Sequence, residues 1–113
     1  MSFTIVDDYF QRYRDFVDSK VRLGNSNLAS SSNDDNGYYT RLNLGALGLA
    51  GESGEVVDLL KKVIHGKELD RSKLVDEMGD VLWYFTLICN VTGLSFDEIM
   101  KHNMNKLNER YGK

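Results

Sequence analysis

Two stretches of the sequence decide the fold: residues 48–60, GLAGESGEVVDLL, and residues 74–85, LVDEMGDVLWYF. Each stretch holds a pair of acidic residues three positions apart, and these are Glu52 with Glu55 and Glu77 with Asp80. Residues three apart lie on one face of an α-helix, and here that face continues into apolar side chains. Because such a face packs inward, the pattern predicts two neighbouring helices whose acidic pairs face each other in the core.

Hydrophobic periodicity predicts helices along most of the chain. Apolar residues recur at helical spacing in four segments, which are residues 4–23, 39–65, 72–92 and 96–111. The chain has no proline, so the expected helix stops are the glycines that follow these segments, Gly24, Gly66 and Gly93. Ser95 and Glu98 have the spacing of a capping box at the start of the last helix. No segment alternates like a strand, so we expect an all-α four-helix bundle with antiparallel neighbours.

Residues 24–37, GNSNLASSSNDDNG, are too polar to bury an apolar face. We expect a mobile loop there. It is either a plain linker or a lid that orders over a ligand, since long loops in small domains are often functional.

Composition favours a soluble globular protein. The 113 residues predict a single domain, residues 1–113, whose small core is completed by oligomerisation. A net charge of −3 gives no basic footprint for nucleic acid. The lone Cys89 lies in an apolar run, which predicts a buried thiol in a reducing compartment. Polar residues interrupt that run and the N-terminus carries no signal pattern, so we expect a cytoplasmic protein without a membrane span.

Four carboxylates brought together repel one another and are costly to desolvate, so either their pKa values rise or cations neutralise them. An all-oxygen set of ligands favours Mg²⁺, with Mn²⁺ as a substitute. Zinc and di-iron sites use histidine or cysteine, and His65 and His102 lie outside the acidic pairs. The alternative is that the acids are surface groups paired with Lys61, Lys62 or Lys73.

Glycines recur at every third position, at 45, 48, 51 and 54, within the second predicted helix. Each costs roughly 1 kcal/mol against alanine in a helix interior, so a compensating contact is expected. One explanation is close helix packing. The other is that Gly48, one turn before Glu52, leaves room for a ligand, and the two explanations are compatible.

In the last predicted helix, Asn103, Lys106 and Arg110 lie on one stripe, with Tyr111 beside it. Such a stripe of donors can bind phosphate oxygens, although basic residues there also complement the helix dipole. Lys62 is a further candidate for a phosphate contact.

These motifs resemble those of the all-α nucleoside triphosphate pyrophosphohydrolases, the MazG-like family related to dimeric dUTPases and dCTP pyrophosphatases. The resemblance rests on Glu52-Ser-Gly-Glu55, on Glu77-Met-Gly-Asp80 with its continuation to Trp83, and on the closing segment from Asn103 to Tyr111. It covers residues 44–111. A proline often follows the Arg-Tyr pair in this family, whereas this chain has Gly112, and the stretch before Asn43 matches only loosely.

The resemblance implies hydrolysis of nucleoside triphosphates, ribo or deoxy, between the α and β phosphates, with Mg²⁺ held by the four acids. Glu52 or Glu55 would orient the attacking water, and the donors of the last helix would hold the triphosphate. It also implies a homo-oligomer, either a dimer or a tetramer. Candidates for contacts with the base are Tyr38, Tyr39, Arg41, Asn43 and Trp83, for each of which core packing or solvent exposure is the alternative.

Two other classes of function stay open at this point. One is a carboxylate-bridged di-iron redox bundle, which would be unusual without histidine ligands. The other is a helical module that binds nucleotide or protein without catalysis, because motifs alone do not prove turnover.

Overall fold

The computed structural model describes residues 5–24 and 35–112. It contains four helices: α1 (Ile5–Gly24), α3 (Asp35–Ile64), α4 (Arg71–Thr92) and α5 (Phe96–Tyr111). No strand occurs in the described ranges, so the predicted all-α class is confirmed. The helix bounds follow the sequence pattern closely, except that the second predicted helix begins earlier, at Asp35.

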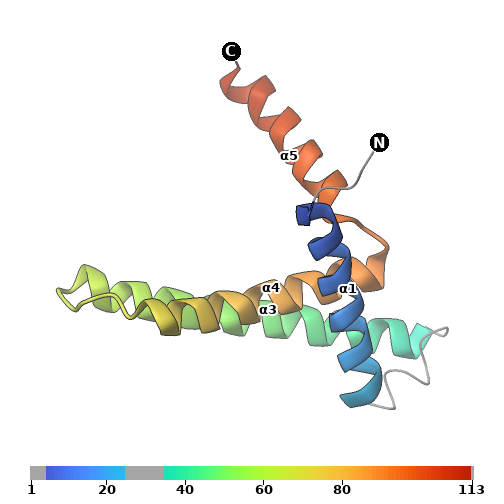
Figure 1. The fold of residues 1–113 in the computed structure, drawn as a ribbon, viewed down its shortest axis with the longest axis horizontal. Coiled ribbons are helices and arrows are strands. Elements are labelled where there is room, and N and C mark those ends of the chain that lie inside the picture. Colours follow the sequence, from blue (N-terminus) through green and yellow to red (C-terminus); the bar gives the residue numbers. More distant parts are fainter. Residues whose placement is uncertain (1–4, 25–34, 113) are drawn as a thin grey trace.

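Two long antiparallel helices form the frame of the molecule. α3 and α4 lie side by side along most of their length as a hairpin, and α1 crosses the C-terminal half of α4 (Figure 1). The turn between α3 and α4 contains Gly66, whose φ of 101° lies in the left-handed region that favours glycine. Asp70 then caps α4, its side chain accepting a hydrogen bond from the backbone N–H of Lys73 at 3.1 Å.

The buried core lies between α1 and α4. Val17, Val21 and Leu87 are its most buried members, and around them pack Tyr13, Leu44, Trp83, Tyr84 and Val91. Two reciprocal hydrogen bonds also join the helices: Arg14 Nε donates to Asn90 Oδ1, and Asn90 Nδ2 donates to the Arg14 carbonyl, each at 3.0 Å. Cys89 is buried on α4, as the sequence predicts.

α5 is attached to the rest of the molecule at its first turn. Gly93 ends α4 with a φ of 78°, and Ser95 and Glu98 form the predicted capping box. The ring of Phe96 packs against Phe10 of α1 at 5.2 Å and Phe85 of α4 at 5.4 Å, measured between centroids. Beyond this anchor, every residue from Met100 to Tyr111 is exposed.

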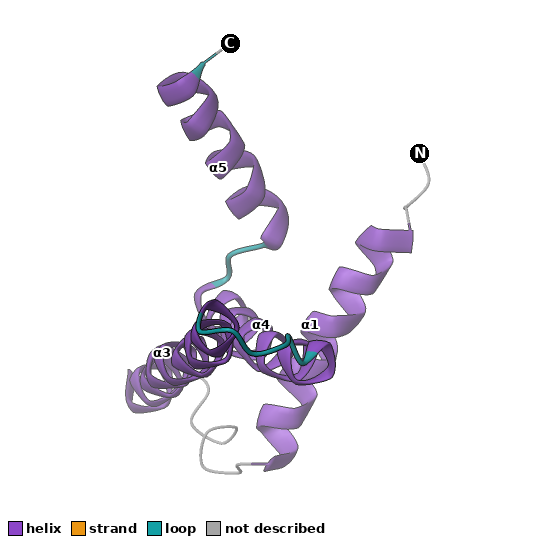
Figure 2. Cartoon of the chain, turned by 90° about the vertical axis from the view of Figure 1, so that its left-hand side faces the viewer, coloured by secondary structure: helices purple, strands orange, loops and turns teal. Residues whose placement is uncertain are grey.

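The described helices give the predicted all-α fold, and α5 is the helix that stands apart from the other three. α5 projects away from the α3–α4 hairpin in both views (Figures 1 and 2). Completion of the bundle by oligomerisation stays a prediction. No described helix is both long and apolar enough to cross a membrane.

The predicted polar loop, residues 24–37, contributes its two ends to helices: Gly24 closes α1, and α3 begins at Asp35. The remaining residues, 25–34, lie outside the described ranges. The structure therefore does not test whether this segment is a linker or a lid.

The glycines of α3 divide into two kinds. A Cβ at Gly45 would lie 2.6 Å from Ile88 Cγ1, and one at Gly48 would overlap the ring of Tyr84. Close packing on α4 thus accounts for both residues, and the space at Gly48 is filled by Tyr84 rather than left for a ligand. By contrast, a Cβ at Gly51 or Gly54 would meet nothing within 4 Å.

We expect opposite effects from alanine at Gly48 and Gly51. Gly48→Ala should destabilise the fold by about 1–3 kcal/mol, because the added methyl group forces the Tyr84 ring to move. Gly51→Ala, on the same helix in open space, should stabilise it by up to about 1 kcal/mol through helix propensity. Urea unfolding of the two variants measures both changes. Equal effects would contradict the packing assigned to Gly48.

Candidate metal centre

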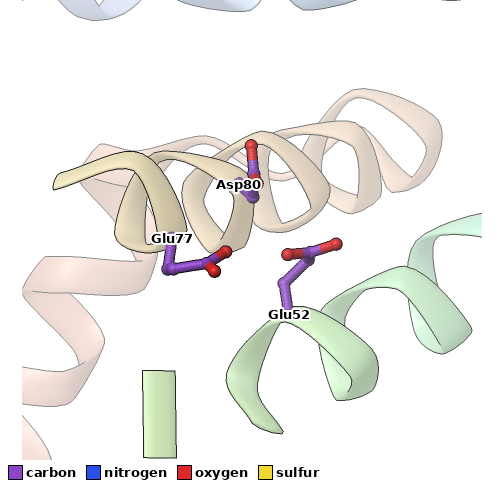
Figure 3. Close-up of side chains that lie close together, drawn as sticks. All are labelled: Glu52, Glu77 and Asp80. Carbon is purple, nitrogen blue, oxygen red and sulfur yellow. The ribbon is translucent and has the colours of Figure 1, made fainter. Parts of the chain in front are cut away.

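Three of the four predicted acids converge between the two helices of the hairpin. Glu52 of α3 and Glu77 and Asp80 of α4 each offer a carboxylate oxygen, and these oxygens lie within 4.8 Å of one another. Figure 3 shows Glu52 rising from α3 toward α4, with Glu77 reaching into the same space. We call these residues the three-carboxylate cluster. Glu52 and Glu77 are half-buried and Asp80 is exposed, so the cluster opens to solvent instead of lying in a sealed core, as the sequence pattern had suggested.

Desolvation and like charges in the cluster both act on Glu52. Partial desolvation and the negative charges of Asp80, Glu77 and Glu55, together with a hydrogen bond to Asp80, raise the pKa of Glu52 above its ordinary value of 4.5. Among the described side chains, lysine forms ion pairs with Asp58 and Asp97 but with none of the four predicted acids. The alternative that these acids are neutralised by surface lysines therefore loses its support.

Glu55 is the acid that the structure sets apart. It lies one turn further along α3, is exposed, and does not belong to the three-carboxylate cluster. Its charge nevertheless acts on Glu52, because it contributes to the raised pKa of that residue. Glu55 is thus a neighbour of the cluster and not a member of it.

Tyr13 is a neighbour of the cluster that the sequence pattern did not single out. Its periodic position on α1 predicts only core packing, and it does pack against the core. Burial and the nearby charge of Asp80 raise the pKa of the Tyr13 phenol, which shows that α1 brings this side chain close to the cluster. Only the packing of α1 across α4 places it there, and no local motif in the sequence signals such packing.

The oxygen ligands of the cluster suit a hard divalent cation. All three are carboxylate oxygens, which match the preference of Mg²⁺ and Mn²⁺, whereas zinc and di-iron sites use Cys or His ligands. Next to the cluster lies an open depression of about 560 Å³, and its lining includes Glu77 and Asp80 together with Asp70, Ser72, Lys73 and Asp76. A cation bound by the cluster would therefore be accessible to a ligand from solvent.

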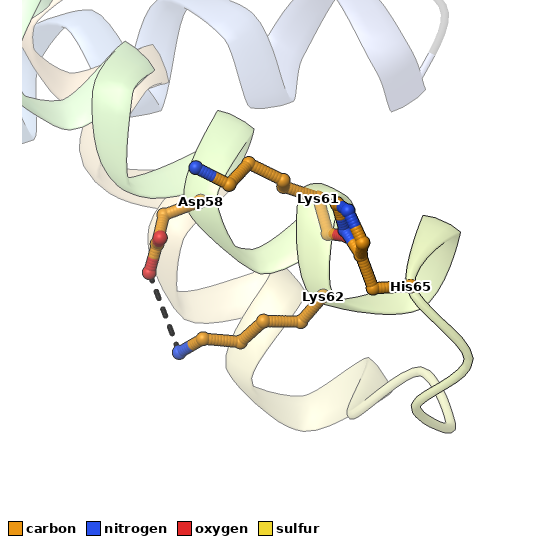
Figure 4. Close-up of polar contacts among 4 residues, drawn as sticks. All are labelled: Asp58, Lys61, Lys62 and His65. Carbon is orange, nitrogen blue, oxygen red and sulfur yellow. Dashed lines mark hydrogen bonds and ion pairs between the residues drawn. The ribbon is translucent and has the colours of Figure 1, made fainter.

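The residues predicted to bind phosphate do not reach the cluster within a single chain. Asn103, Lys106, Arg110 and Tyr111 lie on the exposed part of α5, which points away from the hairpin (Figure 1). Lys62 forms an exposed ion pair with Asp58, with Nζ 3.3 Å from Oδ2, while the neighbouring His65 contacts the carbonyl of Lys61 (Figure 4). A pair this exposed is worth at most about 1 kcal/mol and leaves Lys62 able to exchange partners.

The residues predicted to contact the base differ in how far they are exposed. Trp83 is half-buried against the core and packs edge-to-face on Tyr84, with 5.2 Å between centroids. Tyr38 and Tyr39 pack on each other at the start of α3, and both are exposed, as is Asn43. Arg41 is half-buried on the same helix. Core packing is thus confirmed for Trp83, while the exposed residues remain available for ligand contacts.

Comparison with known proteins gives two matches and one negative result. Residues 42–113, more than half of the chain, match the MazG nucleotide pyrophosphohydrolase domain. The chain is also similar to the Gene 37 protein of Mycobacterium phage L5, with 33% identity over 69 residues. That match covers 57% of this chain and 60% of the phage protein, so it spans less than two thirds of the relative's length. No solved structure matches the chain significantly.

We expect Glu52→Gln to stabilise the metal-free protein near neutral pH. The raised pKa of Glu52 means that the folded state binds its proton more tightly than the unfolded state, so ionisation of Glu52 at neutral pH costs stability. The amide removes that charge. Thermal unfolding with and without Mg²⁺ measures the effect: the wild type should gain stability from Mg²⁺ and the variant should gain much less. Glu68→Gln, at an exposed position in the α3–α4 turn, is the control and should behave as wild type.

Proposed function

Because the chain belongs to the MazG nucleotide pyrophosphohydrolase family, we propose that it hydrolyses nucleoside triphosphates between the α and β phosphates. The products would be a nucleoside monophosphate and pyrophosphate, and the substrates ribo- or deoxynucleotides. The observation that carries the proposal is the three-carboxylate cluster, which lies inside the segment that matches the family domain.

Mg²⁺ is the cofactor that we assign to this reaction, with Mn²⁺ as a substitute. Glu52, Glu77 and Asp80 would hold it, since their oxygens are close enough together to share one cation. When bound, such an ion offsets charge on phosphate oxygens and lowers the pKa of a coordinated water. Binding the ion also relieves the repulsion that raises the pKa of Glu52, so cluster and cofactor stabilise each other.

Glu55 is our candidate for the general base. A general base needs a carboxylate that is close to the reacting groups and able to accept a proton from water. Glu55 is exposed, lies outside the cluster, and sits one turn from Glu52 on α3. Glu52, the other candidate from the sequence, is better placed as a ligand because it faces Glu77 and Asp80 directly (Figure 3).

Asn103, Lys106 and Arg110 would bind the triphosphate, with Tyr111 beside them and Lys62 and Asn43 as further contacts. These donors lie on a helix that projects from its own hairpin, so they would reach a cluster only after a change in α5 or from a second chain. We further propose that the protein works as a homo-oligomer, a dimer or a tetramer. Large exposed apolar side chains on α3, α4 and α5 support this, among them Ile64, Val75 and Met104.

Product analysis tests the proposed reaction. Purified protein is incubated with ribo- and deoxynucleoside triphosphates and Mg²⁺, and pyrophosphate is measured separately from orthophosphate. We expect monophosphate and pyrophosphate in equal amounts, and no turnover after chelation of Mg²⁺. Glu55→Gln should lower kcat by about 10²–10⁴-fold, the usual contribution of a general base, whereas Glu68→Gln should leave it unchanged.

Release of orthophosphate would contradict the assigned cleavage position. Tight nucleotide binding by folded, Mg²⁺-loaded protein without any turnover would instead identify a nucleotide-binding module.

A further inference from the structure

One face of α3 is mostly apolar, largely exposed and free of charged residues. Six residues define it, and we call them the α3 seam: Ala46, Ala50, Ser53, Val57, Leu60 and Ile64. Its three large members are substantially exposed, Val57 to 62%, Leu60 to 41% and Ile64 to 81%. Isolated exposed apolar residues are ordinary, but a continuous row of them on one helix face indicates a contact surface.

The spacing of the α3 seam is that of a helix-pairing surface. Its members follow one another at intervals of four, three, four, three and four residues, which is the alternation of a heptad repeat. At 1.5 Å per residue, the seam runs for about 27 Å along the helix. It is turned away from α4, because the α4-facing positions of α3 are Gly45 and Gly48, which contact Ile88 and Tyr84.

We propose that the α3 seam pairs with the same surface of a second copy of this chain, the two α3 helices running antiparallel about a two-fold axis level with Glu55. The proposal specifies the contact surface of the homo-oligomer proposed above, and it does not depend on the hydrolytic activity.

Side-chain size identifies the partner. The N-terminal half of the seam carries only small residues, Ala46, Ala50 and Ser53, and the C-terminal half carries only large ones. In an antiparallel pair centred on residue 55, Ala46 lies opposite Ile64, Ala50 opposite Leu60, and Ser53 opposite Val57. Every layer then joins one small and one large side chain, so the helices stay at an even separation and the layers fill without voids.

A parallel pair would not fit in this way. Ala46 would face Ala46 at one end and Ile64 would face Ile64 at the other, which leaves a gap at the first layer and crowds the last. An unrelated partner would give no reason for the two halves of the seam to complement each other about one point. Self-complementarity of this kind is expected of a two-fold interface, in which the same patch serves both subunits.

Pairing through the α3 seam leaves the proposed active site open. Glu52 points toward α4 (Figure 3), and helical spacing places the seam residues on a different side of the same helix. A second copy seated on the seam therefore covers exposed apolar side chains without covering the three-carboxylate cluster.

Cysteine cross-linking tests the antiparallel register. In Ala50→Cys/Leu60→Cys protein, each new thiol lies opposite the other position of the second copy, so mild oxidation should give mostly disulfide-linked dimer. Ala50→Cys alone should not cross-link, because the two copies of residue 50 would lie about 15 Å apart along the axis, beyond disulfide reach. The wild type, whose Cys89 is buried, is the control for background oxidation.

Sedimentation of charge variants provides a second readout that does not depend on disulfide formation. Ile64→Lys should shift the protein toward monomer, because it buries a charge in the interface. Leu47→Lys is the matched control: it is 72% exposed on the same helix but lies off the seam, and it should keep the wild-type mass.

The outcomes separate this proposal from the others. A wild type that sediments as a monomer at high concentration overturns both the seam and the homo-oligomer. An oligomer that resists Ile64→Lys, or that cross-links through Ala50→Cys alone, overturns the seam while the homo-oligomer stands. Hydrolysis of nucleotides is measured separately, and its failure would leave the proposed seam contact standing.

Discussion

Crowding of three carboxylates between α3 and α4 is the physical constraint that dominates this protein. Carboxylate oxygens of Glu52, Glu77 and Asp80 lie within 4.8 Å of one another, and desolvation together with the neighbouring negative charges raises the pKa of Glu52. The helices hold them in place through close packing elsewhere. Gly45 and Gly48 let α3 approach Ile88 and Tyr84 of α4, and this approach brings the acids of the two helices to a common point. A divalent cation, which we propose that this cluster binds, would offset the repulsion and connect the fold to the proposed chemistry on a nucleotide.

Local sequence signals predicted much of the fold. The capping box at Ser95 and the left-handed glycines at 66 and 93 depend on residues within one turn of each other, and the structure has all three features. The convergence of acids from two helices also followed from the sequence, because helical periodicity places each pair on one face. The role of Tyr84 in filling the space beside Gly48 did not follow, since it depends on how two helices approach each other.

Features set by long-range packing were out of reach of the sequence. The pattern treated Glu52 and Glu55 as equivalent, yet positions three apart on an α-helix differ by roughly 60° in direction, which is enough to leave Glu55 exposed beside the cluster. Tyr13 approaches Asp80 only because α1 crosses α4. The direction of α5 is set by the short connection after Gly93 and by the packing of Phe96. This direction separates the residues predicted to bind phosphate from the acids within one chain. That separation, like the exposed seam of α3, is a feature that a second chain would explain.

Titration of the Glu52 carboxyl group shows most directly whether crowded carboxylates at this site are relieved by a cation. With ¹³C-labelled glutamate, NMR can follow this carboxyl carbon against pH, with and without Mg²⁺, and Glu52→Gln assigns its signal. We expect a pKa above the ordinary value of 4.5 in metal-free protein and a marked fall in that pKa when Mg²⁺ is present, because the cation favours the charged form. A pKa at or below the ordinary value in metal-free protein, with no response to Mg²⁺, would contradict this expectation.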